Sequence, residues 1–346
     1  MKIFLSKDVI EEIMVFKDNY PNLSAIFSSN SQMIFDMTNE ELDKILSNSE
    51  SDLSQIIRGY DISHEAQKGI LDYYKKNINE TLKEPRSLFF MDIDKSKAES
   101  LSKDYGVMIL SASEPDDLIF NHARFKYRLN KGDILSGTVQ DVWLQTFSEM
   151  KTLPMNSLVI SDSYLFDYSD IEDSVKNIEG MLDLVLPKAF KDTFHVLFFS
   201  NEMHKEKNVI DKAIGDIKAY INSRRSYPIL IEYVFYKALH QRKIISNYDT
   251  IVFDKGFVVF KTVSNKQVKT IDTNYINCSA VYDNAADSLG MTGYDIVSED
   301  LEDLKKLYEE CKGVCLSQHP DSQKRILGTN NKVKNLNNRL INCVDN

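Results

Sequence analysis

The sequence is poor in cysteine and has no long apolar run. Its 346 residues contain four cysteines, too few for a disulfide framework in a chain of this length, so we expect free thiols in a reducing compartment. No window approaches the roughly 18 uninterrupted apolar residues that a membrane span requires. The opening MKIFLSKDVI has too short an apolar run for a signal peptide. These absences predict a cytoplasmic protein without a transmembrane segment.

Positive charge is also scarce. The chain has 42 Lys and Arg residues against 52 Asp and Glu residues, and its formal net charge is −10. Because non-specific binding to nucleic acid needs cations that displace counterions from phosphates, this balance argues against a protein that coats nucleic acid. A local basic patch would still permit such binding. Residues 323–346 are a candidate patch, although their many asparagines favour a solvated chain end.

What the sequence does contain is enough apolar material for a buried core, since 42% of its residues are hydrophobic. Residues 1–84 are mostly polar with helical spacing, which predicts a helical N-terminal region. Thr38 followed by Glu41 has the capping-box arrangement that begins a helix. Apolar residues recur at helical spacing over residues 65–82, which predicts a second helix.

After residue 84 the pattern changes to short apolar runs separated by amphipathic segments. Residues 87–94 are predicted to contain a strand and residues 95–105 a helix that is closed by Gly106, before another short strand. A second strand–helix–strand unit follows over residues 157–200. This order predicts an α/β fold in which one mixed sheet extends over residues 85–285.

The end of this region is predicted to be a hairpin. Residues 248–263 contain two apolar runs, and Asp254, Lys255 and Gly256 between them are typical turn residues. Residues 286–346 are then predicted to form a helical and irregular C-terminal region.

A histidine, an arginine and an asparagine stand just before an apolar run in the stretch LHQRKIISNYDTIVFDKGF. His240, Arg242 and Asn247 have the spacing H-x-R-x-x-x-x-N. Enzymes of the phospholipase D type use H-x-K-x-x-x-x-D, in which the histidine attacks phosphorus, the lysine holds the phosphate oxygens and the acid supports the arrangement. The stretch resembles the phospholipase-D-like domain at the carboxyl end of eukaryotic microtubule-interacting-and-trafficking proteins and of bacterial relatives.

The resemblance covers residues 150–285 and includes Asp162 and Tyr164 after an upstream apolar run. It implies a phospholipase-D-like fold more strongly than catalysis, because arginine replaces the lysine, asparagine replaces the acid, and the eukaryotic relatives bind membranes without hydrolysis. It thus implies a non-catalytic or weakly catalytic binding and interaction module with a protein partner in a multi-protein complex, as an accessory component of a bacterial defence or stress system. Nucleic acid and acidic phospholipid are further candidate ligands, and no cofactor is expected.

The predicted ligand site consists of His240, Arg242, Lys243 and Tyr248. The planar guanidinium group of Arg242 is suited to phosphate. Phosphate binding would therefore survive the replacement of the motif's acid by Asn247 better than catalytic turnover would. The structural alternative is that His240 and Arg242 bond carbonyls or carboxylates, such as that of Glu232, at the entrance of a strand.

A rival prediction is a phosphodiesterase or nuclease that acts on nucleic acid or phospholipid. In one version His240 is the nucleophile, and Arg242 and Asn247 complete the catalytic set. In the other version a magnesium ion is bound at the carboxyl edge of the sheet. Its candidate ligands are Asp92, Asp94 and Asp162. The structural alternative is that Asp94 caps the helix that follows it and that Asp162 supports a turn.

Overall fold

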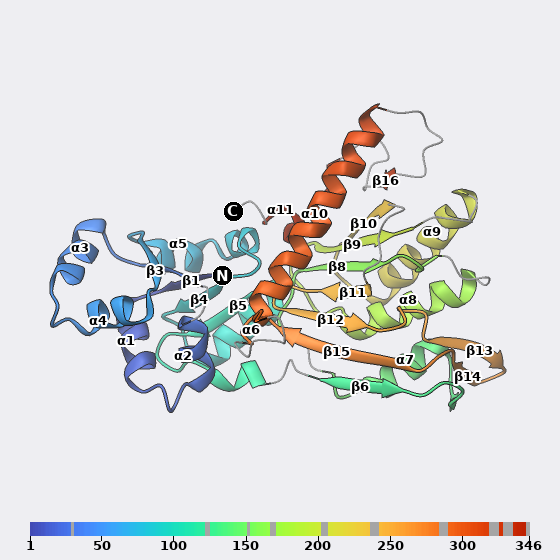
Figure 1. Cartoon of the computed structure of the whole chain (residues 1–346), viewed down its shortest axis with the longest axis horizontal. Helices are drawn as coiled ribbons and strands as arrows, with labels where there is room; N and C mark the ends of the chain where they lie inside the picture. The colour runs from blue at the N-terminus through green and yellow to red at the C-terminus, as the bar shows by residue number, and fades with distance from the viewer. Residues whose placement is uncertain are drawn as a thin grey trace.

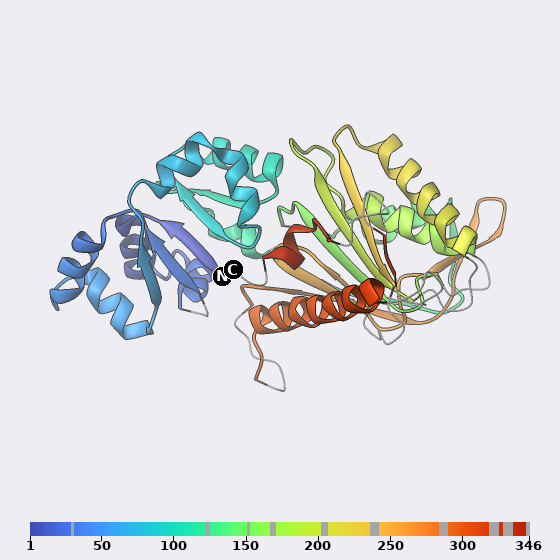
Figure 2. The same ribbon diagram turned by 90° about the horizontal axis from the view of Figure 1, so that it is seen from above.

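The structure is a computed structural model, and it describes residues 1–28, 31–121, 125–150, 153–166, 171–201, 207–235, 242–283, 290–317, 325–327 and 335–343. The chain folds into two lobes that lie side by side, each built on its own sheet (Figures 1 and 2). Among the described residues, no helix is both long enough and apolar enough to span a membrane.

The N-terminal lobe contains a parallel sheet with the strand order β3-β2-β1-β4-β5. Its strands are β1 (Lys2–Leu5), β2 (Gln32–Phe35), β3 (Ser63–Ala66), β4 (Leu88–Met91) and β5 (Met108–Ser111). Apart from the polar edge strand β3, each strand has at least three buried residues. Such continuous burial is typical of parallel strands that are covered on both faces.

Helices cover both faces of this parallel sheet. They are α1 (Lys7–Val15), α2 (Pro21–Phe27), α3 (Asn39–Ser47), α4 (Asp52–Tyr60), α5 (Ile70–Lys76), α6 (Lys95–Tyr105) and the short 3-10 helices η1 (Ile78–Lys83) and η2 (Asp117–Asn121). On one face Phe4 and Phe89 pack against Tyr74 of α5. On the other face, α1, α2 and α4 bury their apolar residues against Ile3 and Phe90.

The C-terminal lobe contains a mixed sheet with the strand order β16-β10-β9-β8-β11-β12-β15-β6. Its strands are β6 (Lys126–Leu129), β8 (Ser157–Asp162), β9 (Phe194–Ser200), β10 (Ile229–Phe235), β11 (Arg242–Ile245), β12 (Asp249–Phe253), β15 (Asn274–Ala280) and β16 (Arg325–Leu327). The central strands β8, β9 and β10 are parallel, and the remaining pairs are antiparallel. A smaller sheet of β13 (Phe260–Ser264), β14 (Gln267–Thr270) and β7 (Ile134–Ser136) lies beside it.

The helices α7 (Val139–Thr146), α8 (Ile171–Val185) and α9 (Lys207–Arg224) cover one face of the mixed sheet. The long helix α10 (Gly293–Ser317) crosses the other face, together with α11 (Arg339–Asn342) (Figure 1). Leu301 of α10 and Val159 of the sheet beneath it belong to the same apolar cluster as Ile3 and Phe90 of the N-terminal lobe. The two lobes therefore share one continuous apolar core.

Several predictions from the sequence are confirmed. The chain has an α/β fold with a mixed sheet. The strand after His240 lies inside that sheet, between β8 and β12. The helix over residues 95–105 also has the predicted ends. The Asp94 side chain accepts a hydrogen bond from the Lys97 N–H, and Gly106 closes the helix with a φ of 61°.

The prediction of a helical region over residues 1–84 needs a correction, because this region also contributes β1, β2 and β3. The single sheet predicted over residues 85–285 is in fact two sheets, since β4 and β5 pair with β1 in the N-terminal lobe. Four-residue apolar strands such as KIFL and QMIF are hard to distinguish from pieces of an amphipathic helix. Their partner strands lie far away in the sequence.

The predicted hairpin over residues 248–263 is wrong. β12 pairs with β11 and β15, whereas β13 pairs with β14. The turn residues instead redirect the chain, because Gly256 has a φ of +95° and the next N–H, that of Phe257, donates to the Asp162 carboxylate. A Cβ on Gly256 would lie 2.7 Å from Asp162 Oδ2, so this close approach requires glycine.

The C-terminal region is helical, as predicted, but its described last part is packed rather than solvated. Leu340 and Ile341 of α11 are fully buried. Arg339 donates to the carbonyls of Asn156 and Thr193 and pairs with Asp192. The described residues 335–343 therefore contribute to the core.

Candidate functional site

The histidine of the predicted motif, His240, lies outside the described residues, but its neighbours have clear contacts. Arg242 begins β11, is half-buried, and donates from Nη1 to the main-chain carbonyl of Asp254 at 2.5 Å. Its guanidinium lies 5.5 Å from the ring centroid of Tyr164. These contacts agree with the structural alternative for Arg242, although they are to a carbonyl and a ring and not to Glu232. The phosphate-binding role of His240 and Arg242 stays a prediction.

Lys243 was predicted to bind the ligand, and its ammonium group already has a carboxylate partner. Its Nζ donates to Oδ1 of Asp300 on α10. Both side chains are largely buried. The pair fastens α10 to the mixed sheet.

Asn247 and Tyr248, predicted as catalytic and ligand-binding residues, are fully buried at the junction of the lobes. The Asn247 amide donates to the carbonyls of Pro85 and Gly106, and its oxygen accepts from the Asn156 N–H. The Tyr248 hydroxyl donates to one main-chain group of the N-terminal lobe and accepts from another. Neither side chain is exposed to solvent, and this burial does not favour the catalytic and ligand-binding roles predicted for them. Their polar groups join the lobes instead.

The predicted magnesium site is not formed by the structure. Asp92 is exposed and follows β4 of the parallel sheet, and Asp94 caps α6. Asp162 ends β8 of the other sheet. Among the described residues, no group of three or more His, Cys, Asp or Glu side chains could hold a metal ion. The prediction assumed that all three aspartates follow strands of one sheet. They do not meet, because β4 and β8 belong to two different sheets.

Asp162 instead supports a turn, as its structural alternative predicted. Its carboxylate accepts from the N–H groups of Tyr164 and Phe257 at 2.9 and 3.0 Å. Burial raises the pKa of Asp162 to about 6, against the lowering effect of these two bonds and of nearby Arg242. Burial is the stronger effect here because the side chain is fully enclosed.

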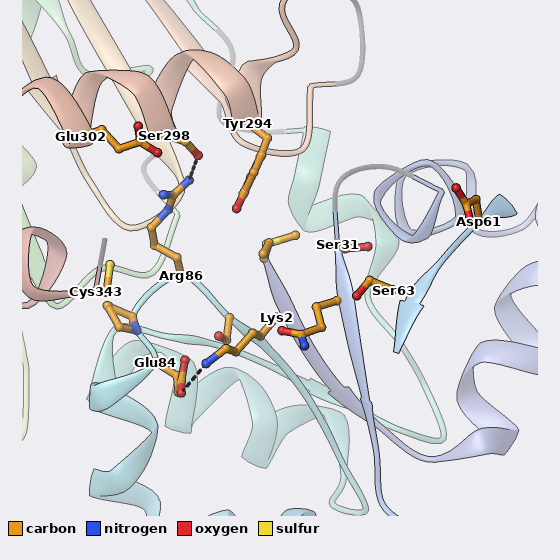
Figure 3. A pocket seen from close by; sticks show the side chains of 14 residues that line it. Lys2, Ser31, Asp61, Ser63, Glu84, Arg86, Tyr294, Ser298, Glu302 and Cys343 are labelled. Atoms are coloured by element: carbon orange, nitrogen blue, oxygen red, sulfur yellow. Dashed lines mark hydrogen bonds and ion pairs between the residues drawn. The ribbon is translucent and has the colours of Figure 1, made fainter. Parts of the chain in front are cut away.

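A pocket of about 580 Å³ lies between the lobes and was not predicted from the sequence (Figure 3). It opens at the amino-terminal ends of the parallel strands, where Lys2, Gln32 and Ser63 begin β1, β2 and β3. Helix α10 supplies the opposite wall. The lining residues are Met1, Lys2, Ser31, Gln32, Asp61, Ser63, Glu84, Pro85, Arg86, Ser87, Tyr294, Ser298, Glu302 and Cys343.

Arg86 is the central cation of this pocket. It stands just before β4 and reaches across to α10, where Nη2 donates to the Ser298 hydroxyl at 3.2 Å. Its guanidinium lies 5.1 Å from the ring centroid of Tyr294. Within the described part of the chain, Arg86 has no carboxylate partner, and its buried Nε has no hydrogen-bond acceptor. A guanidinium with free donors in a pocket is suited to a carboxylate or phosphate.

The other charges of the pocket are arranged differently. Lys2 is neutralised by Glu84, 3.1 Å away at the base of the pocket. Asp61 and Ser63 lie on the side away from Arg86 (Figure 3). Glu302 lies one helical turn beyond Ser298 on α10. The pocket therefore presents free donors at Arg86 and acceptors at its acidic residues.

Comparisons with known proteins give no family for the chain. A scan against protein-family models finds no match, and a search of curated proteins finds no similar sequence. The phospholipase-D-like resemblance therefore stays a prediction.

Arg86 was missed because a lone arginine before a strand carries no motif. The only signal in the sequence was its place at the first strand after Pro85. Its partners Tyr294 and Ser298 come from a helix more than 200 residues later.

Proposed function

We propose that this protein is a binding and interaction module, non-catalytic or weakly catalytic, that binds a small anionic ligand in the pocket between its lobes. The observation that carries the proposal is the guanidinium of Arg86. It is held by Tyr294 and Ser298, yet it has no carboxylate partner among the described residues. A half-buried guanidinium with free donors gains charge-assisted hydrogen bonds when a carboxylate or phosphate binds.

The pocket also limits the chemistry of the ligand. A carboxylate or phosphate group fits against Arg86, because the planar guanidinium binds either group through two parallel hydrogen bonds. At the other side, Asp61 and Ser63 accept hydrogen bonds from hydroxyl or amino groups. The ligand class is thus a small polar molecule with one anionic end and hydrogen-bond donors at the other.

The rival function, a phosphodiesterase or nuclease, has less support from the contacts. Asn247 is buried in the junction, and Arg242 is bonded to a main-chain carbonyl. The proposed protein partner is a part of the same hypothesis, and a pull-down from the native host tests it.

Inorganic phosphate is the simplest probe of the pocket. The melting temperature of the wild type should rise with phosphate by more than that of Arg86→Gln, because a ligand stabilises only the protein that binds it. At ten times its Kd, such a ligand adds about 1.4 kcal/mol to the free energy of unfolding. Chloride at equal ionic strength controls for screening of charge.

Phosphate also stabilises proteins by exclusion from their surface, so the comparison between variants is decisive. Lys212→Gln, an exposed cation on α9 of the C-terminal lobe and not a lining residue of the pocket, is the matched control and should respond like the wild type. An equal phosphate effect on the wild type and on Arg86→Gln would contradict phosphate binding at Arg86. Loss of the folded state in Arg86→Gln would be recognised by circular dichroism, and Arg86→Lys would then replace it.

A further inference from the structure

A basic surface lies at the far end of the C-terminal lobe, in a chain that is acidic overall. Residues 125–136 and 254–277 together contain seven Lys and Arg residues but only three Asp residues and no Glu. Six of these cations form a surface that we call the basic edge. They are Lys126 and Arg128 on β6, Lys131 in the following turn, Lys261 on β13, and Lys266 and Lys269 at and after the β13–β14 turn.

The structure brings these two segments together. β6 pairs with β15, and the turn after β6 bonds to the end of β14, where the Gly132 N–H donates to the Thr270 carbonyl at 3.1 Å. β7 then pairs with β14. The strands β6, β13 and β14 accordingly lie at one end of the lobe, away from the interlobe pocket (Figure 1).

The cations of the basic edge are not neutralised by the described residues. None of the six has a carboxylate within ion-pair distance in the described part of the chain, and five are exposed. Lys261 and Lys269 stand directly opposite each other in the antiparallel pair of β13 and β14. Like charges in such a pair destabilise a sheet, so their presence is explained if a polyanion binds there.

An aromatic ring lies among these charges. Tyr275 is directly opposite Arg128 in the pair of β15 and β6, with the guanidinium 5.5 Å from its ring centroid. The ring is 47% exposed. On the same face, Lys126 is opposite Asn277, and both are exposed. A strand face with an exposed ring, a stacked arginine and flanking lysines has the elements that bind unpaired bases and their phosphates.

We infer that the basic edge binds single-stranded nucleic acid, with a base stacked on Tyr275 and phosphates held by Arg128 and the lysines. A single strand fits better than a duplex, because only an unpaired base offers its face to the ring. The acidic remainder of the protein repels the phosphates and leaves the basic edge as the binding surface. This site is independent of the proposed pocket at Arg86.

Binding is measured by fluorescence anisotropy of a labelled 20-residue oligothymidylate, which forms no duplex of its own. The wild type should bind with an affinity that falls as salt rises, because each neutralised phosphate releases counterions. Tyr275→Ala should weaken binding by at least about fivefold, the lower limit for loss of one stacked base, whereas Tyr275→Phe should not.

Lys261→Glu separates binding from stability. The new carboxylate would face Lys269, so the variant should melt no lower than the wild type, yet it should bind the oligothymidylate about tenfold more weakly. Lys97→Glu, at an exposed position of α6 in the other lobe, changes the net charge equally and should leave binding unchanged. Arg86→Gln should also bind like the wild type, which distinguishes this site from the pocket.

Several outcomes would overturn the inference. One is an equal loss of binding in Lys97→Glu and Lys261→Glu, which would show a general charge effect. A second is a duplex of equal length that binds as tightly as the single strand, together with unchanged binding in Tyr275→Ala. This result would show that the surface attracts phosphates but does not stack a base. Binding to anionic phospholipid vesicles without binding to the oligothymidylate would assign the surface to a membrane, and no binding to either would remove the site.

Discussion

The side-chain amide of Asn247 donates a hydrogen bond to the main-chain carbonyl of Gly106, 3.1 Å away, and thereby joins the two lobes. Asn247 lies in the turn between β11 and β12, and Gly106 is the residue at which α6 ends. The same amide donates to Pro85, just before β4. One buried side chain thus fixes both ends of the β4–α6 unit against the mixed sheet.

Asn247→Asp should destabilise the protein strongly, although it changes only an amide to a carboxylate. The carboxylate cannot donate to the carbonyls of Pro85 and Gly106, and its charge would be buried against them. We expect a loss of about 3 kcal/mol or more in the free energy of unfolding, measured by urea denaturation. Asn277→Asp, at an exposed position of β15, should change it by less than about 0.5 kcal/mol. Equal stabilities of the two variants would contradict the junction role of Asn247.

Gly106→Ala tests the close approach of the lobes at the end of α6. Gly106 has a φ of +61°, and a Cβ there would lie 2.0 Å from the carbonyl oxygen of Met155. The contact is to main chain, so it cannot be relieved by a side-chain rotation. We expect the melting temperature to fall by about 10 °C or more, since a backbone clash exceeds the cost of an ordinary substitution.

Gly59→Ala is the matched control for this substitution. Gly59 lies inside α4, and no atom is within 4 Å of the position that its Cβ would occupy. Alanine has the higher helix propensity, so this variant should be stabilised by up to about 1 kcal/mol. A similar melting temperature for both alanine variants would mean that residues 106 and 155 are not in contact.

Tyr248→Phe should loosen the same junction without changing its shape. The hydroxyl donates to the Ser87 carbonyl at 2.6 Å and accepts from the Met108 N–H at 2.8 Å. Its removal leaves two buried main-chain groups without a partner, which costs about 2–4 kcal/mol. Tyr275→Phe removes an exposed hydroxyl and should be neutral. Denaturant midpoints measure both, and a neutral Tyr248→Phe would show that water replaces the hydroxyl.

The buried carboxyl of Asp162 should make stability depend on pH. Its pKa is about 6 in the folded protein and near 3.8 when unfolded, because burial disfavours the charged form. The folded state therefore holds the proton more tightly, and stability falls as pH rises from about 4 to about 6. Between pH 5 and pH 7 this residue should cost about 1 kcal/mol of stability.

Asp162→Asn removes this titration. The free energy of unfolding of the wild type, relative to the variant, should be about 1 kcal/mol greater at pH 5 than at pH 7. Asp18→Asn changes an exposed acid and should show no such difference between the two pH values. The expected dependence would be absent if Asp162 were hydrated and ionised at pH 5.

The sequence by itself determined the local features of this protein. The ends of α6 follow from Asp94 and Gly106, and the start of α3 follows from Thr38 and Glu41. Such caps involve hydrogen bonds between residues three or four positions apart, so a short stretch of sequence is sufficient to specify them. The alternation of apolar strands and amphipathic helices likewise indicated the α/β class.

Only the tertiary structure decided which strands share a sheet and which polar side chains are available. The four apolar residues of β4 do not specify a partner strand by themselves, and β4 pairs with β1 where both of its faces are packed. Asn247 had the position of a catalytic residue in the sequence and became a junction residue because three main-chain groups of distant segments surround it. Arg86 had no motif and became a candidate ligand residue because α10 meets it from 212 positions away. Whether a polar group is satisfied is a property of its neighbours in space, and these are fixed only when the whole chain has folded.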